Sequence, residues 1–292
     1  MPGEALVLVD DPAPFVRRLT LNRPEKRNAL SNRLRGELFD ALHAGDLDRE
    51  VRVMIIRGAG PCFSAGYDLA PDPNDPLPWY TAPGDGQWPR HVVAGWFDIW
   101  DLATPVIAQV HGWCLAGGSE LATACDLVYV AEDAQIGYPP VRTMSTPDMQ
   151  FHPWLMGMRV AMEQMLTGDA LSGADAARVG WANRAFPAAD LEREVLRIAE
   201  RVAAIPPDLQ QLNKRSVHRA MEVMGARTAI RYGSEILALG LHQRSSKEYL
   251  RDMVNGRLGD ALARRDAPFG DYGQATTADG DATATPREES AR

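Results

Sequence analysis

The spacing of hydrophobic residues along the chain separates a first part of short apolar runs from a second part with a helical period. Runs of β-branched and aliphatic side chains predict strands at residues 5–9, 16–21, 51–58, 106–110 and 126–131. Each run is short, and polar residues or glycine end it or follow it. With helices placed between them, these strands predict the α/β fold class.

Helices are predicted from a different spacing. Residues 32–44, between the second and third strands, carry apolar side chains at Leu34, Leu38, Phe39 and Leu42. The order strand–helix–strand makes a right-handed crossover the expected connection. From Trp154 onward the chain is mainly helical, with helices expected at 154–168, 172–180, 190–204, 207–223, 227–240 and 244–264.

These elements divide the chain into three parts. We expect an α/β core over residues 1–195 and a C-terminal helical region over 196–265. Residues 266–292 are rich in Ala, Thr, Gly, Asp and Pro and contain almost no aliphatic side chains, which predicts a disordered tail.

Composition and charge exclude several classes of protein. The net charge of −8 gives no basic face for nucleic acid, and no apolar run is long enough to span a membrane. The N-terminus lacks the pattern of a secretory signal. The three cysteines are an odd number without zinc-site spacing, so we expect a cytoplasmic protein with no disulfide framework and no metal.

The stretch "GWCLAGGSELATACD" is the strongest candidate for chemistry. Its glycines, Gly112, Gly117 and Gly118, precede a predicted helix, and they match neither the dinucleotide-binding motif nor the phosphate loop. Amides at a helix N-terminus have no partner inside the helix, so the Gly117 amide can donate to a carbonyl oxygen that becomes an enolate. Glu120 lies one turn further on the same face and would move the proton. The simpler interpretation is close packing of the helix on a sheet.

A second amide for such an oxyanion hole is expected at another strand end. The stretch "CFSAGYDL" follows the strand at 51–58 and exposes Ala65 and Gly66 at a tight turn. We interpret Asp68 in this turn as a residue that bonds local amides.

Four stretches resemble the enoyl-CoA hydratase/isomerase (crotonase) superfamily, in its order and spacing over about residues 5–265. They are "NRPEKRNAL", "GAGPCFSAGYDL", "VIAQVHGWCLAGGSELATACDLVYVAEDAQIG" and "LTGDALSGADAARVGWANRAFP". The resemblance implies a spiral of ββα repeats with a C-terminal helical region that forms a homotrimer or a dimer of trimers. It also implies an acyl-CoA thioester as substrate, with coenzyme A carried by the substrate and no separate cofactor.

The resemblance also assigns residues. The oxyanion-hole amides map onto Ala65 and Gly117, with Gly118 beside them. Residues where members contact the CoA moiety map onto Arg23, Lys26 and the segment Ala65–Leu69, which includes Gly66, Tyr67, Asp68 and Leu69.

The chain departs from the family pattern at the second catalytic acid. Family hydratases hold one water between two glutamates, and the first maps onto Glu120. The second would end a motif that here reads "IGYPP", so Pro140 stands in its place. Proline has no ionisable group and no N–H, which argues against a standard two-glutamate hydratase.

Asp148 is the candidate for a replacement acid, because dienoyl-CoA isomerases of the family carry an acid at about this offset. The alternative is that Asp148 caps the following helix, for which Thr-Pro-Asp is a good start signal. His152 and Trp154 are candidates for the same pocket, although a single histidine beside an aromatic residue is more often structural.

The leading hypothesis is an enzyme of fatty acid metabolism, a lyase or isomerase that forms an enolate and uses Glu120 as acid and base. Double-bond isomerisation with Asp148 and hydrolysis of a CoA thioester or β-diketone are the alternatives. A CoA-thioester-binding protein with little catalysis is the hypothesis from another class, because the second family glutamate is missing.

Overall fold

A six-stranded sheet forms the centre of the computed structural model, which describes residues 5–69, 75–256 and 258–272. Its strand order is β1-β2-β3-β4-β6-β9, in which β1 and β2 are antiparallel and the other neighbours parallel. The strands are β1 (Val7–Ala13), β2 (Val16–Leu21), β3 (Val53–Gly58), β4 (Val106–Val110), β6 (Leu127–Ala131) and β9 (Arg184–Phe186). The predicted α/β class and the five strands predicted from apolar runs are confirmed.

A second, three-stranded sheet was not predicted. It consists of β5 (Trp113–Leu115), β7 (Gln135–Gly137) and β8 (Leu171–Ser172), in the order β5-β7-β8. Ser64 joins the segment after β3 to β5, because its amide donates to Trp113 O and its carbonyl accepts from Leu115 N, both at 3.0 Å. The small sheet therefore brings the two glycine-containing stretches side by side.

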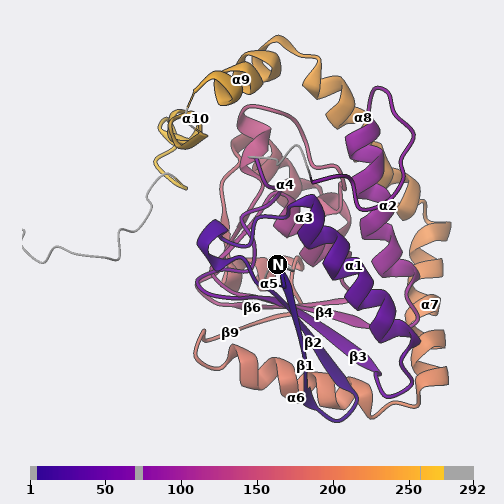
Figure 1. Ribbon diagram of the computed structural model, residues 1–292. Helices are drawn as coiled ribbons and strands as arrows, with labels where there is room; N and C mark the ends of the chain where they lie inside the picture. The colour runs from indigo at the N-terminus through magenta and orange to yellow at the C-terminus, as the bar shows by residue number, and fades with distance from the viewer. Residues whose placement is uncertain (1–4, 70–74, 257, 273–292) are drawn as a thin grey trace, which may run out of the picture.

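Helices cover both sides of the six-stranded sheet (Figure 1). Helix α1 (Asn32–Leu47) begins at Ser31, whose side chain accepts from the amide of Leu34, and it packs against β1 and β2. Helix α6 (Leu191–Ala203) lies along the other side and contacts all six strands through an apolar face. Helix α6 runs through residue 195, and the division into a core and a C-terminal region at that residue stays a prediction.

The remaining helices surround the second glycine stretch and extend the chain toward its end. Helix α2 (Gln87–Asp101) contacts α3 (Gly117–Ala124) and α8 (Ala226–Leu241), and α8 contacts α7 (Pro207–Val223). Every residue of α3 is buried. The other helical segments are η1 (Pro24–Lys26), η2 (Pro139–Arg142), α4 (His152–Thr167), α5 (Gly173–Val179), α9 (Arg244–Asn255) and α10 (Leu258–Asp266).

The first residues of the predicted tail make specific contacts with the rest of the chain. Arg142, whose side chain is only 2% exposed, binds Asp266 at 3.1 Å and Asp271 at 2.6 Å. The hydroxyl of Tyr272 donates to the carbonyl of Gly168 at 2.9 Å. Ionic and aromatic contacts thus replace the missing aliphatic ones. The rest of the predicted tail, 273–292, lies outside the described residues.

Within the described ranges, no helix is both long and apolar enough to cross a membrane. The cysteines Cys62, Cys114 and Cys125 are all buried and free.

Candidate active site

Glu120 lies in the first turn of α3 with only 1% of its surface exposed, and its carboxylate accepts several hydrogen bonds. The hydroxyl of Tyr67 donates to Oε2 at 2.5 Å, and the hydroxyl of Tyr138 donates to Oε1 at 3.1 Å. Backbone amides of Asp148 and Met149 donate to Oε1 at 2.8 and 3.5 Å. The acid predicted from the glycine stretch is therefore buried and fully surrounded by donors.

The supporting elements explain how these donors meet. Tyr138 directly follows β7, and Ala116 of the α3 N-terminus donates to the carbonyl of Gly137 in that strand at 3.0 Å. Tyr67 belongs to the strand-like segment that pairs with β5. The indole of Trp96 on α2 donates to the Tyr67 hydroxyl at 2.9 Å. The carboxylate is thus held from three separate elements.

Burial changes the acidity of every group around this centre. It raises the pKa of Glu120 to about 7, although the hydrogen bonds from Tyr67 and Tyr138 favour the carboxylate and oppose the rise. Burial, together with the nearby charge of Glu120, also raises the pKa of Asp148. Two neighbouring carboxyl groups with raised pKa values are typical of acid–base catalysis, because one can remain protonated near neutral pH.

Asp148 is buried beside Glu120 and does not cap the following helix. Helix α4 begins at His152, and its N-cap is Phe151, which has no side-chain capping bond. Asp148 is 2% exposed, and its Oδ1 has no hydrogen-bond partner among the described residues. The capping interpretation is therefore wrong, and a carboxyl oxygen remains free for another group.

Of the two amides predicted for the oxyanion hole, those of Ala65 and Gly117, the Ala65 amide is used elsewhere in the structure. The amide of Ala65 donates to the carbonyl of Arg27 at 2.9 Å and is not free for a ligand. Residues 66–68 pair with Leu30, whose amide donates to Gly66 O and whose carbonyl accepts from Asp68 N. Because successive residues of an extended segment face opposite sides, the amide of Tyr67 points away from Leu30.

The Tyr67 amide faces the side on which α3 begins. In the described part of the chain, neither the Tyr67 amide nor the Gly117 amide has a hydrogen-bond acceptor. The two are close together, because a Cβ added to Gly66 would lie 3.2 Å from the Gly117 nitrogen. Gly118 serves packing, since a Cβ there would lie 2.6 Å from the carbonyl oxygen of Ser64. The geometry therefore offers Tyr67 and Gly117 as the donor pair.

His152 lies behind Tyr138, with the ring centroids 6.4 Å apart. Its Nδ1 bonds Oε1 of Gln150 at 2.8 Å, and burial lowers its pKa to about 4, so the ring is neutral at pH 7. Trp154 is half-buried and packs against the core. Neither side chain contacts Glu120, so neither is part of the acid centre.

Most of the residues predicted to contact CoA are partly or fully exposed, in contrast to the buried Glu120. Arg23 forms a 2.9 Å ion pair with Asp68, and the local amide bonds expected for Asp68 stay a prediction. Lys26 ends η1 and is exposed, and Leu69 is 38% exposed. Pro140 is half-buried and is the second residue of η2, which begins directly after Tyr138.

Two polar residues near this centre were not predicted. Trp96 bonds the Tyr67 hydroxyl, and Arg35 is fully buried beneath Trp79 and Trp88. In the sequence, both residues look like ordinary members of a helix. The only sign of a special environment is the large number of aromatic residues between positions 79 and 100.

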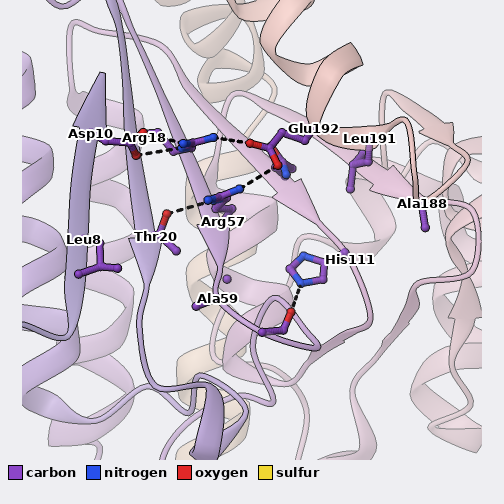
Figure 2. A pocket seen from close by; sticks show the side chains of 13 residues that line it. Leu8, Asp10, Arg18, Thr20, Arg57, Ala59, His111, Ala188, Leu191 and Glu192 are labelled. Carbon is purple, nitrogen blue, oxygen red and sulfur yellow. Dashed lines mark hydrogen bonds and ion pairs between the residues drawn. The ribbon is translucent and has the colours of Figure 1, made fainter. Parts of the chain in front are cut away.

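A cavity of about 660 Å³ lies elsewhere, where β2, β3 and β4 meet the start of α6. Figure 2 shows Arg18 and Arg57 reaching Glu192, and Arg18 also reaching Asp10. These ion pairs neutralise Arg18 and Arg57 in the cavity, and none of the predicted site residues lines it. No group of three or more His, Cys, Asp or Glu side chains in the described residues is placed to hold a metal ion.

Comparison with known proteins agrees with this arrangement. The family model described as enoyl-CoA hydratase/isomerase matches residues 15–255. The mitochondrial enoyl-CoA hydratase of Pongo abelii is 31% identical over 208 residues, which are 70% of this chain and 69% of that protein.

Solved structures show the same fold. A crystal structure of enoyl-CoA hydratase from Mycobacterium smegmatis has a TM-score of 0.83 and 29% identity, covering 93% of this chain and 96% of that one. An enoyl-CoA hydratase/isomerase from Xanthobacter autotrophicus Py2 has a TM-score of 0.81 and 34% identity, covering 91% and 99%. The crotonase-like architecture is thereby confirmed, and the chain belongs to the enoyl-CoA hydratase/isomerase family.

Proposed function

We propose that this enzyme moves a carbon–carbon double bond within an acyl-CoA thioester through an enolate intermediate. The observation that carries the proposal is the burial of the Asp148 carboxyl group beside Glu120, with one oxygen free of hydrogen bonds. Two adjacent acids suit a reaction in which one carbon loses a proton and another gains one.

The proposed reaction starts from a 3-enoyl-CoA ester. The amides of Tyr67 and Gly117 donate to the thioester oxygen, and ionised Glu120 removes a proton from C2. The electrons of the C2–H bond shift toward the thioester oxygen and give a dienolate, which the two amides stabilise. Protonated Asp148 then gives its proton to C4, and the double bond ends between C2 and C3. Proton exchange between the two acids restores the starting state.

Hydration is supported less well by the same residues. The Pro140 side chain has no group that could hold or activate a water. A hydrolase would need an activated water at the thioester carbon, for which the region offers the same two acids. The substrate test below separates these outcomes.

The test incubates the purified chain with 3-hexenoyl-CoA and with 2-hexenoyl-CoA in D2O, followed by mass spectrometry. We expect conversion of the 3-enoyl ester to the 2-enoyl ester, with deuterium exchange at C2 and C4. Formation of 3-hydroxyacyl-CoA as the main product would instead identify a hydratase, and release of free CoA would identify a hydrolase. Either result would overturn the isomerase proposal.

One observation favours a second candidate, a CoA-thioester-binding protein with little catalysis. The Glu120 carboxylate is saturated by donors, and the Tyr67 hydroxyl occupies Oε2 at 2.5 Å, the oxygen without amide donors. A binding protein would retain such a carboxylate for structure alone. Tight binding of hexanoyl-CoA, with no product and no deuterium exchange from either enoyl ester, would support this candidate.

We further propose that the active form is a homotrimer or a dimer of trimers built through the C-terminal helices. Large apolar side chains are exposed on α7 and α8, including Leu212, Val217, Ile236 and Leu239. Exposed apolar surface of this kind marks contacts between subunits. Light scattering should give a mass three or six times the chain mass of 32.0 kDa. A monomeric mass at micromolar concentration would contradict the proposal.

A further inference from the structure

Arg35 of helix α1 carries a buried positive charge that forms no ion pair with a carboxylate in the described part of the chain. The residue is 0% exposed, and its Nη2 donates to Oδ1 of Asn32 at 2.7 Å. Its Nε has no acceptor, and among the described residues no Asp or Glu lies within ion-pair distance of the guanidinium. A buried guanidinium stays protonated and is costly without an anionic partner.

The side chains that enclose Arg35 add further unused donors. Its guanidinium lies over the Trp79 and Trp88 rings, 5.5 and 4.7 Å from their centroids. His91 stacks on Trp79 with centroids 4.2 Å apart, and its Nδ1 bonds the Thr81 hydroxyl at 2.9 Å. Trp79 Nε1 and His91 Nε2 are both buried without a partner. Burial and the charge of Arg35 lower the pKa of His91 to about 4, so its neutral ring can present Nε2–H as a donor.

Three unpartnered polar atoms in one cluster are not explained by packing. Buried polar groups in native proteins almost always find a hydrogen-bond partner, and an exception calls for a specific reason. Arg35 Nε and Trp79 Nε1 are obligate donors, and His91 Nε2 is a donor in the tautomer in which the Thr81 hydroxyl donates to Nδ1. The two obligate donors need an acceptor, and a buried guanidinium without an ion pair favours an anionic one.

This cluster adjoins the proposed reaction centre. The Trp88 ring that covers Arg35 meets the Tyr67 ring edge to face, with centroids 5.2 Å apart, and Tyr67 bonds Glu120. Asp75 and Asp148 act on Arg35 through space, but neither forms an ion pair with it among the described residues, and the Asp75 carboxylate accepts from the Asn32 amide at 2.9 Å. The pKa of Asp148 is itself raised, so its protonated form is favoured and does not replace the missing anion. Tyr67, Trp88 and Arg35 thus form a continuous series of contacts from Glu120 to this cluster.

We propose that Arg35, Trp79 and His91 form a subsite for a carboxylate at the far end of the acyl group, so that the substrate is a mono-CoA thioester of a dicarboxylic acid. This inference rests on the proposed function and names its substrate class. The guanidinium would pair with the carboxylate, and the indole and imidazole N–H groups would bond its oxygens. Trp79 and Trp88 would shield the pair from water.

The test needs only the wild-type chain. Isothermal titration calorimetry compares succinyl-, adipyl- and suberyl-CoA with their methyl esters, and hexanoyl-CoA serves as the neutral reference. We expect one of the free acids to bind about tenfold or more tightly than its own methyl ester, because a buried charged hydrogen bond replaces a neutral group. Equal affinities for acid and ester at every length would overturn the inference and leave water or a structural role for Arg35.

The same titrations separate the two proposals. Binding of hexanoyl-CoA without preference for any acid would overturn only the subsite. Failure of hexanoyl-CoA and all other esters to bind would overturn the proposed function and the subsite with it.

A pair of variants locates the preference. Arg35→Gln should abolish the discrimination between acid and ester while hexanoyl-CoA binding remains. Arg33→Gln is the matched control, because Arg33 lies on the same helix with its side chain 48% exposed and pairs with Glu37 at 2.9 Å. Circular dichroism checks that each variant is folded. A preference that persists in folded Arg35→Gln would overturn the assignment to Arg35.

Discussion

The backbone amide of Asp148 donates to Oε1 of Glu120 at 2.8 Å, so two buried carboxyl groups that are distant in sequence belong to one hydrogen-bonded unit. Only the backbone of Asp148 takes part in this bond, so its carboxyl group remains available for other contacts. The position of one acid therefore depends on the charge of the other, because an ionised Glu120 accepts this bond more strongly than a protonated one.

Glu120→Gln should reduce turnover of 3-hexenoyl-CoA by about 10²–10⁴-fold, the usual contribution of an acid–base group. The amide side chain keeps the shape but accepts no proton. Binding of hexanoyl-CoA, measured by calorimetry, should persist because the Tyr67 and Gly117 amides remain. Full turnover in this variant would disprove the proposed mechanism.

Asp148→Asn should reduce turnover about as much and leave the melting temperature near that of the wild type. The reason is that Asp148 caps no helix, so no capping energy is lost. Paired measurements of kcat and thermal unfolding check both statements. A drop in stability with unchanged kcat would identify Asp148 as structural.

The pH dependence of kcat/KM should follow the ionisation of Glu120. Because its pKa is raised to about 7 and the base form is the carboxylate, activity should rise through about pH 7 toward a plateau. Tyr138→Phe removes a donor that favours the carboxylate, so the inflection should move to higher pH. Tyr80→Phe, at a site 86% exposed, is the control. An inflection at the same pH in Tyr138→Phe and wild type would contradict the assignment.

The same raised pKa acts on stability. Between pH 4.5, the usual value for glutamate, and about 7, the unfolded chain has released a proton that the folded chain retains. The contribution of Glu120 to the free energy of unfolding therefore decreases as the pH rises through this window. Urea titrations at pH 5 and pH 7.5 measure it, and Glu120→Gln should reduce the difference.

Gly66→Ala should impair catalysis by displacing the two free amides. Gly66 has φ of +102°, and a Cβ would lie 2.9 Å from Leu115 O and 3.2 Å from the Gly117 nitrogen. Loss of one well-placed donor costs about 10²–10³-fold in kcat. Gly84→Ala is a matched control, because Gly84 also has a positive φ (+122°) but open space around it. Equal activity of the two variants would argue against the amide pair.

The resemblance implies that family hydratases carry an acid at the position of Pro140, so Pro140→Glu should increase water addition to crotonyl-CoA. The Pro140 carbonyl accepts from the amide of Met144 at 2.7 Å, and glutamate keeps this acceptor. Pro140→Gln controls for the change in shape. Hydration that is no higher in Pro140→Glu than in Pro140→Gln would show that the missing acid is not the limiting feature.

The longer elements and the first acid could be read from the sequence, whereas the finer geometry could not. Apolar runs and helical spacing indicate which strands and helices are buried. Glycines directly before a helix indicate free backbone amides near Glu120. The strands β5, β7 and β8 are too short to show a period. The choice between Ala65 and Tyr67 depends on which way a peptide N–H points, and this is set by pairing with Leu30 and β5.

Two other residues show where local signals mislead. Thr-Pro-Asp is a good helix start, but the chain turns Asp148 inward and begins α4 four residues later, at His152. Arg35 has the charge of a surface residue, yet Trp79 and Trp88 from a distant segment cover it completely. Tertiary contacts between remote segments decide both positions.

The ion pairs of Arg142 give the end of the chain an influence on acidity at its centre. Arg142 ends η2, the short helix that starts directly after Tyr138, and it holds Asp266 and Asp271 from the C-terminal segment. A chain that stopped at residue 265 would lose both aspartates and leave a buried guanidinium with Asp169 as its remaining anion. The turn that directs the Tyr138 hydroxyl toward Glu120 would then loosen. Shortening the chain at its C-terminal end would thereby change the proton affinity of the distant Glu120 carboxylate.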